Sequence, residues 1–292
     1  MDDSDERSAY VTVLGNVLGR ATIILDEGGV DLEKASDNLF AADPQALYER
    51  WDEFRNWLSG WQPDFDRVAA VPLIEAELLS PAPFPSQVFG IGLNYRDHAA
   101  ETGAEMPGRL AVFTKYPTCI TGGFEEIVLP DGGTVDHEVE LVVVMGRRAH
   151  HIADWEAWEH VAGVCVGNDV SERTLQRAAG NQFCLGKSFP GFGPMGPWLV
   201  TPDELTQPDD LALSCVVNGE VRQSSRTSEM VYPVSRIIEE ISAVVPLLPG
   251  DVIFTGTPAG VGWVHGRFLE PGDVVECTIE SIGTIRNTAG HA

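Results

Sequence analysis

Two glutamates in the segment VDHEVELVVVMG stand two residues apart where alternation and β-branched residues predict a strand. Glu138 and Glu140 would then point to the same face of the strand, about 6–7 Å apart along it. On an exposed face the pair would simply be solvated. The run from Leu141 to Met145 is too apolar for a solvent edge, however, and buried carboxylates need a compensating cation. A hard divalent ion bound through oxygen atoms would provide that compensation.

A third carboxylate, Asp169, follows another apolar run in VAGVCVGNDVSER. Taken alone, an Asp in such a position is usually a turn former or a helix N-cap. Taken with Glu138 and Glu140, it suggests a site for Mg²⁺, alternatively Mn²⁺ or Ca²⁺, that keeps open positions for water and substrate.

The segment GIGLNYRDHAAETG places His98 and Glu101 three residues apart, which makes them neighbours on one face if the segment is helical. An imidazole oriented by a carboxylate is a workable general base. The alternative is a surface pair in a short helix, and for an isolated H-x-x-E pattern that alternative is the commoner case.

The segment PGDVIFTGTPAGVG predicts a strand that runs into a turn at Thr255, Gly256 and Thr257. Such a turn can present N–H groups and hydroxyls to a carboxylate. A tight loop that needs Gly for its backbone angles explains the pattern equally well.

Two phosphate-like patterns do not meet the requirements of their motifs. GFGPMG carries Pro194, which prevents the helix that a dinucleotide site requires, and LGKS has Asn181 where a phosphate-binding loop needs Gly. Lys187 in LGKS is therefore available for another task.

The elements that must position these residues fall into two parts. An N-terminal strand, a Gly-Gly turn and a second strand are expected in RATIILDEGGVDL. They precede a helix that begins at Asp43 and Pro44 and carries an apolar stripe to Trp61. The proline-rich SPAPFPSQ predicts a boundary between a small domain, residues 1–80, and a larger one, residues 84–292. The larger part has many short apolar runs and few helical signals, chiefly DWEAWEHVAG and PVSRIIEEISAVVPL, so an α+β, β-rich fold is expected.

Composition narrows the class of partner and the location. The 292-residue chain has a formal net charge of -25, whose field repels phosphate backbones and anionic lipids, so neither nucleic acid nor a membrane is expected as a partner. Five widely spaced cysteines predict neither a disulfide framework nor a thiolate zinc site. The acidic start MDDSDERSAY does not resemble a signal peptide, and no apolar stretch is long enough to span a bilayer. The expected location is the cytoplasm.

The order of seven segments over about residues 84 to 290 resembles the fumarylacetoacetate hydrolase family. The segments that carry the resemblance are GIGLNYRDHAAE, HEVELVVVMG, GNDVSERTLQ, GKSFPGFGPMGPWLVT, VNGEVRQ, LLPGDVIFTGTPAGVG and LEPGDVVECTIESIG. Seven segments in one order are far more specific than any one of them. The resemblance implies a mixed β-sandwich or β-roll, preceded by a small N-terminal α+β domain, and assembly as a homodimer.

The resemblance also implies roles for named residues. It implies metal ligands at Glu138, Glu140 and Asp169, and an H-x-x-E pair on a lid at His98 and Glu101. It further implies that the bound oxo acid meets Arg173, Gln176, Lys187 and Thr257. One departure is Thr174, where the family commonly has Asp after the Arg.

These roles lead to a hypothesis of divalent-metal-dependent cleavage of a C–C bond in a small 2,4-dioxo acid. His98, oriented by Glu101, would activate water to attack the distal carbonyl, and Lys187 would stabilise the oxyanion. The first alternative is a decarboxylase or isomerase of oxaloacetate-type or hydroxymuconate-type 2-oxo acids. The second is a subunit that shares the fold and has no activity.

Overall fold

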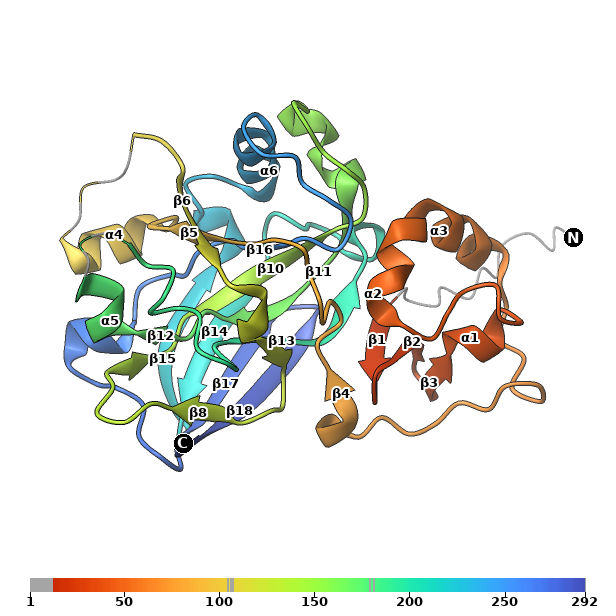
Figure 1. Cartoon of the computed structure of the whole chain (residues 1–292), viewed down its shortest axis with the longest axis horizontal. Coiled ribbons are helices and arrows are strands. Elements are labelled where there is room, and N and C mark those ends of the chain that lie inside the picture. Colours follow the sequence, from red (N-terminus) through yellow and green to blue (C-terminus); the bar gives the residue numbers. More distant parts are fainter. Residues whose placement is uncertain (1–12, 104, 106–107, 179, 181, 292) are drawn as a thin grey trace, which may run out of the picture.

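The computed structural model describes residues 13–103, 105, 108–178, 180 and 182–291 (Figure 1). The acidic start, for which no signal peptide is expected, lies outside the described residues. The helices are α1 (Leu32–Ala35), α2 (Pro44–Leu47), α3 (Trp51–Gly60), α4 (Arg96–Thr102), α5 (Arg173–Ala178) and α6 (Val234–Ser242). None of these helices combines the length and apolarity that a bilayer crossing requires.

Within the described residues, most strands belong to one 11-stranded mixed sheet. Its order is β3 (Gly28–Asp31), β2 (Arg20–Leu25), β1 (Val13–Val17), β13 (Gly193–Val200), β11 (Val161–Asn168), β10 (Val139–Met145), β16 (Val252–Phe254), β5 (Val88–Gly92) and β6 (Ala111–Lys115), with β4 (Leu78–Leu79) beside β1 and β7 (Ile120–Gly122) beside β13. A five-stranded sheet has the order β15 (Glu220–Arg226), β14 (Ala212–Val217), β17 (Val274–Ile279), β18 (Gly283–His291) and β8 (Ile127–Leu129). A short pair joins β12 (Ser171–Glu172) to β9 (Val135–Asp136).

The central strand β10 is buried on both faces, which explains its uninterrupted apolar run. Val139, Leu141 and Val143 belong to the core between the two sheets. Val142 and Val144 belong to a second core on the opposite face. The N-terminal helices supply Leu47, Tyr48, Trp51 and Phe54 to that second core. The expected β-rich α+β fold, a mixed sandwich with a few helices, is confirmed.

The N-terminal part follows the expected local pattern with two differences. The turn between β2 and β3 is made by Asp26 and Glu27, and the two glycines after it begin β3. Asp43 caps α2 by accepting a hydrogen bond from the N–H of Gln45 at 2.9 Å, but a 3₁₀ turn over Tyr48–Arg50 separates α2 from α3. The segment Asp154–His160, expected to be helical, is also a 3₁₀ helix.

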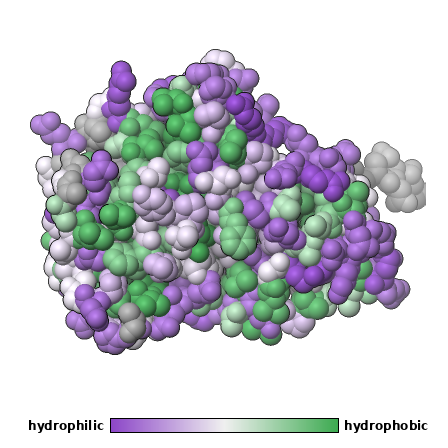
Figure 2. Space-filling model, viewed as in Figure 1, coloured by the Kyte–Doolittle hydropathy of each residue, from purple (hydrophilic) through white to green (hydrophobic). Residues whose placement is uncertain are grey.

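The sheet continues across the expected domain boundary. Strand β1 pairs with β13, with Val13 opposite Val200 and Leu14 opposite Leu199. The N-terminal strands therefore extend the large sheet sideways, as Figure 1 shows at its right-hand side. The division at residues 80–84 stays a prediction. Figure 2 shows hydrophilic side chains along the outer edge of this N-terminal part, with hydrophobic ones among them on the visible face.

Candidate active site

Strand register brings the three predicted metal ligands to one place. Strands β10 and β11 are antiparallel, with Val139 opposite Asn168, so Glu138 faces Asp169 across the pair. The N–H of Asp169 donates to the carbonyl of Glu138 at 2.8 Å. Glu140 lies two residues further along the same face. Carboxylate oxygens of the three residues all lie within 4.8 Å of one another.

Two buried lysines neutralise part of this acidic cluster. The Nζ of Lys187 lies 2.7 Å from Oε2 of Glu138 and 2.5 Å from Oδ2 of Asp169. The Nζ of Lys115 lies 2.5 Å from the other oxygen of Asp169 and also donates to the carbonyl of Phe192 at 3.0 Å. The chain has only three lysines, and these two are 3% and 1% exposed. Their burial is therefore tied to the acidic cluster.

Arg173 connects the acidic cluster to a fourth carboxylate. Its Nη2 lies 2.7 Å from Oε1 of Glu138, and its Nε and Nη2 bind Oδ2 of Asp136 at 2.8 and 2.7 Å. Its Nη1 donates to Oε1 of Gln176 at 3.1 Å. Asp136 is fully buried and also accepts the N–H groups of Gly262 and Trp263. Arg173 is thereby held at both ends of its guanidinium.

Of the three predicted metal ligands, Glu140 is the one whose negative charge is least balanced by neighbouring cations. Among the described residues its hydrogen bond is one from the N–H of Gly256 at 2.8 Å, with no bond from a side-chain cation. Burial, then the charges of Asp169 and Glu138, raise the pKa of Glu140 well above its usual value. Burial opposes the ionisation of Glu138 as well, but Lys187 and Arg173 outweigh it and lower the pKa of Glu138.

The turn at residues 255–257 does bind a carboxylate, but that carboxylate belongs to the chain itself. Gly256 has a φ of +100° and donates its N–H to Glu140. The hydroxyl of Thr257 donates to the carbonyl of Val139 at 2.8 Å and lies 2.8 Å from the donating Nε2 of Gln223. A substrate contact by Thr257 would therefore need its backbone N–H or the remaining lone pair of its hydroxyl.

His98 and Glu101 lie on α4, as expected, without a hydrogen bond between them. The Nδ1 of His98 is 3.9 Å from Oε1 of Glu101, which exceeds hydrogen-bond length. Glu101 instead accepts the N–H of Gly260 through Oε2 at 2.5 Å. Burial lowers the pKa of His98, while the charges of Glu138 and Glu101 oppose that shift. The imidazole is therefore neutral at neutral pH and able to accept a proton.

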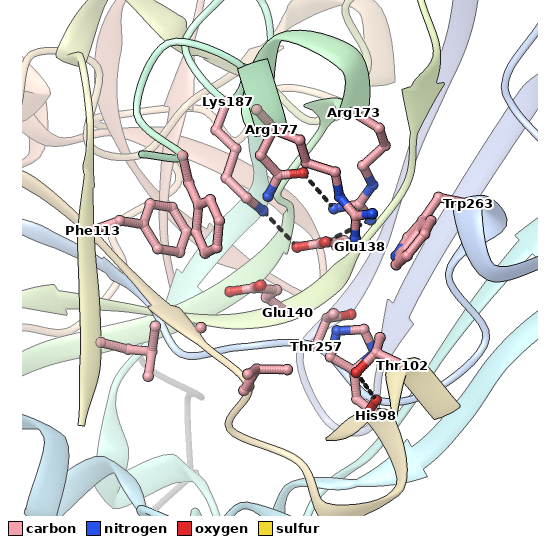
Figure 3. A pocket seen from close by; sticks show the side chains of 15 residues that line it. His98, Thr102, Phe113, Glu138, Glu140, Arg173, Arg177, Lys187, Thr257 and Trp263 are labelled. Atoms are coloured by element: carbon pink, nitrogen blue, oxygen red, sulfur yellow. Dashed lines mark hydrogen bonds and ion pairs between the residues drawn. The ribbon is translucent and has the colours of Figure 1, made fainter. Parts of the chain in front are cut away.

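A cavity of about 360 Å³ opens over these groups (Figure 3). All the predicted site residues border it except Asp169 and Glu101. In Figure 3 Lys187, Arg173 and Arg177 lie on one side, and His98, Thr102 and Thr257 lie on the other, with Glu138 and Glu140 between. The cavity thus offers cations, a neutral imidazole and an acidic centre to one small molecule.

Some residues of the site were not found by sequence reasoning. Lys115 ends the run LAVFTKY, Asp136 precedes the recognised glutamates, and Arg177 and Trp263 border the cavity. Only Asp136 had a local signal, because an acidic residue beside an apolar strand needs a partner. The departure at Thr174 falls on an exposed side chain that bonds to Thr134 at 2.9 Å and does not border the cavity.

The residues present fit a hard divalent cation. Oxygen ligands on opposite sides of Mg²⁺ lie about 4 Å apart, which the spread of these carboxylate oxygens permits. Burial and the charges of Asp169 and Glu138 raise the pKa of Glu140 despite the nearby charge of Lys187, so a further cation would be favourable at this position. Each carboxylate oxygen has more than one acceptor position, so the bonds from Lys187 leave capacity for an ion.

Comparisons with known proteins identify the family. The model of the fumarylacetoacetate hydrolase C-terminal domain matches residues 87–289. A human relative, the mitochondrial oxaloacetate tautomerase FAHD2B, is 44% identical over 225 residues, which cover 76% of this chain and 72% of the relative. This chain belongs to the fumarylacetoacetate hydrolase family. It is an enzyme of the hydrolase, decarboxylase or isomerase type found there, so the alternative of an inactive subunit is wrong.

Two solved structures show the same architecture. Fumarylacetoacetate hydrolase from Exiguobacterium antarcticum has a TM-score of 0.81 at 32% identity, covering 96% of this chain and all of that one. Maleylpyruvate hydrolase from Sphingobium sp. SYK-6, solved with manganese and pyruvate, has a TM-score of 0.79 at 25% identity with the same coverage. The expected cytoplasmic location and the homodimer stay predictions.

Proposed function

We propose that this enzyme depends on a divalent cation and interconverts the keto and enol forms of an oxaloacetate-type 2-oxo diacid. The observation that carries the proposal is the convergence of Glu138, Glu140 and Asp169 within 4.8 Å at a cavity that His98 also borders. The human relative named as an oxaloacetate tautomerase supports the choice of reaction. Mg²⁺ is the proposed ion, and Mn²⁺ or Ca²⁺ are the alternatives.

The cation and the side chains would divide the work. Bound by Glu138, Glu140 and Asp169, a divalent ion would withdraw electrons from the keto acid and make the adjacent C–H more acidic. Lys187 and Arg173 would hold the substrate's carboxylate and balance negative charge that develops on the keto oxygen.

His98 would carry the proton. As a neutral base it would take the proton from the carbon beside the keto group, and the C–H electrons would form the C=C bond. The same proton would then be returned to the former keto oxygen, so the reaction leaves the atom count unchanged. Glu101 would stabilise the transient imidazolium through its nearby charge.

A second candidate is hydrolysis of a C–C bond in a 2,4-dioxo acid such as an acylpyruvate. The manganese and pyruvate in the maleylpyruvate hydrolase structure favour it. In this reaction His98 would take the proton from water instead of carbon. Homodimer formation and a cytoplasmic location belong to the same proposal.

One purified sample separates the candidates. We would follow the enol absorbance of oxaloacetate, pyruvate release from acylpyruvates and CO₂ release from oxaloacetate, each with Mg²⁺, with Mn²⁺ and with chelator, against enzyme-free controls. We expect the enol absorbance to change at a rate well above that of the enzyme-free control, and only when a divalent cation is present. Acylpyruvate cleavage with no tautomerisation would favour the second candidate.

Variants link that activity to the acidic cluster. Glu138→Gln and Asp169→Asn should lower kcat/KM by about a hundredfold or more, because each removes a charged group from the acidic centre. Glu27→Gln, which removes an equal charge from an exposed turn, is the matched control and should behave as the wild type. Full activity in either cluster variant would contradict the proposal.

A further inference from the structure

Arg177 borders the cavity at a point that the proposed chemistry does not use. It lies on α5 one helical turn after Arg173. Its guanidinium carbon sits 3.4 Å from the ring centroid of Trp263, which also borders the cavity. Figure 3 shows Trp263 beside the group of cations that includes Arg177. The aromatic face fixes the position of an otherwise flexible side chain.

The charge of Arg177 has no carboxylate partner in the part of the chain that the structure describes. Arg173 and Lys187 each contact two carboxylates. Among the described residues Arg177 has neither an ion pair nor a hydrogen bond, although the chain has a net charge of -25. Burial and the charge of Arg173 lower the pKa of Arg177, which is the shift expected without a neighbouring carboxylate. A free guanidinium at a cavity is suited to an anionic group of a ligand.

One buried carboxylate contacts both Arg173 and the backbone of Trp263. Asp136 binds the guanidinium of Arg173 and also accepts the N–H groups of Gly262 and Trp263 at 2.7 and 3.0 Å. The guanidinium of Arg173 and the backbone of Trp263, whose ring packs against Arg177, are therefore bound to the same carboxylate. The cavity therefore has a second guanidinium, that of Arg177, in addition to that of Arg173.

We infer that Arg177, held on Trp263, is a specificity-determining residue that binds the distal carboxylate of a 2-oxo diacid. The inference rests on the proposed function for the keto-acid end of the substrate. Arg177 would act on binding and not as the proton carrier, because the distal carboxylate that it contacts neither gives nor takes a proton in the reaction. The enzyme would therefore select diacids over neutral analogues of the same shape.

The test compares the binding of oxaloacetate with that of its 4-methyl ester, in which an uncharged ester replaces the distal carboxylate. Dissociation constants measured by calorimetry at a fixed Mg²⁺ concentration do not require turnover. Wild-type protein should bind the diacid more tightly. Arg177→Gln should weaken diacid binding about tenfold to a hundredfold, the usual effect of losing a hydrogen bond between charged groups. The ester's constant should change less than about threefold.

Further variants separate the charge from the aromatic support. Arg177→Lys should recover part of the preference for the diacid, because it restores the charge without the planar fork. Trp263→Ala should weaken diacid binding, and Trp263→Phe should retain much of it because an aromatic face remains. Arg148→Gln, an exposed arginine outside the cavity, is the matched control.

The outcomes distinguish this inference from the proposed function. Equal weakening of diacid and ester in Arg177→Gln, or no weakening of either, would overturn the inference even if oxaloacetate is turned over. Absence of turnover together with an Arg177-dependent preference for the diacid would reject the proposed reaction and support the distal carboxylate site. In turnover assays the loss should fall mainly on KM, since Arg177 contacts a carboxylate that takes no part in the proton transfer.

Discussion

Glu140 differs from its two neighbours in what surrounds it. Glu138 and Asp169 both contact Lys187, whereas Glu140 receives one backbone hydrogen bond from Gly256. Placing a third carboxylate so close without its own cation costs free energy, because burial and like charges both oppose ionisation. A divalent ion would relieve that cost, which is the residue-scale reason for the proposed metal site.

The pH dependence of kcat/KM tests the proposed role of His98 as the general base. Burial lowers the pKa of this imidazole below its ordinary value of 6.5, so the acidic limb of kcat/KM should lie below that pH. The charge of Glu101 opposes the shift, and its removal in Glu101→Gln should lower the His98 pKa further. The limb should therefore move to lower pH in this variant, as measured by kcat/KM across the acidic range.

Glutamine can still accept the hydrogen bond from Gly260, so the α4 segment should keep its position in the variant. Glu27→Gln is the control for the loss of one negative charge and should leave the limb unchanged. If the acidic limb of Glu101→Gln moved to higher pH or stayed at the wild-type pH, the roles proposed for His98 and Glu101 would be contradicted.

At the residue scale, the site residues that could be predicted are those with a distinctive pattern in the sequence around them. The two-residue spacing of Glu138 and Glu140 in a strand placed them on one face, and the structure has them there. Lys115 lies in an ordinary alternating run, and its burial depends on contacts with Asp169 and Phe192, far along the chain. No local pattern encodes such contacts, and the same holds for Arg177 on Trp263.

At the scale of elements, the approach of α5 to the loop before Lys187 sets the positions of several site residues. A Cβ at Gly186 would lie 2.5 Å from the backbone N of Gln176. The loop cannot easily move away, because the carbonyl of Gly186 accepts the N–H of Glu172 at 2.7 Å. Glycine is therefore required there for the loop to reach the helix.

Gly186→Ala should consequently disturb both stability and activity. We expect a loss of about 1–3 kcal/mol in the free energy of unfolding, the usual cost of overpacking. We expect kcat/KM to fall about tenfold to a hundredfold, because Lys187 and Gln176 would shift. Urea unfolding and steady-state kinetics measure the two effects.

Gly60→Ala is the control for Gly186→Ala, because no atom lies within 4 Å of its added Cβ. Its stability should stay within about 0.5 kcal/mol of the wild type. Wild-type stability and kinetics in Gly186→Ala would show that α5 and the loop can separate at no cost, contrary to this explanation.

The strands themselves were predictable from short β-branched and apolar runs, but their order was not. The place of β13 between β1 and β11 depends on pairings between residues far apart in sequence. A proline-rich segment near residue 80 predicts a boundary, yet hydrogen bonds between β1 and β13 extend one sheet across it. Local composition indicates where a boundary in the sequence lies, but it does not indicate which strands will pair.

At the scale of the whole molecule, the net negative charge of the protein and the positive groups at the cavity have opposite effects on an anionic substrate. A net charge of -25 repels an anionic substrate at long range. At the cavity, Arg177 and a divalent ion held by Glu138, Glu140 and Asp169 would supply the local positive charge that attracts it. The fold brings Arg177 together with carboxylates from strands β10 and β11, so the site exists only when distant segments have assembled.

Titration of the protein with Mn²⁺ by calorimetry tests the metal site most directly. We expect one ion per chain in the wild type, because one set of three carboxylates converges. Affinity should fall about tenfold or more in Glu138→Gln and in Asp169→Asn, whereas the exposed Asp26→Asn should bind as the wild type does. Unchanged stoichiometry and affinity in the two cluster variants would contradict a metal centre formed by these residues.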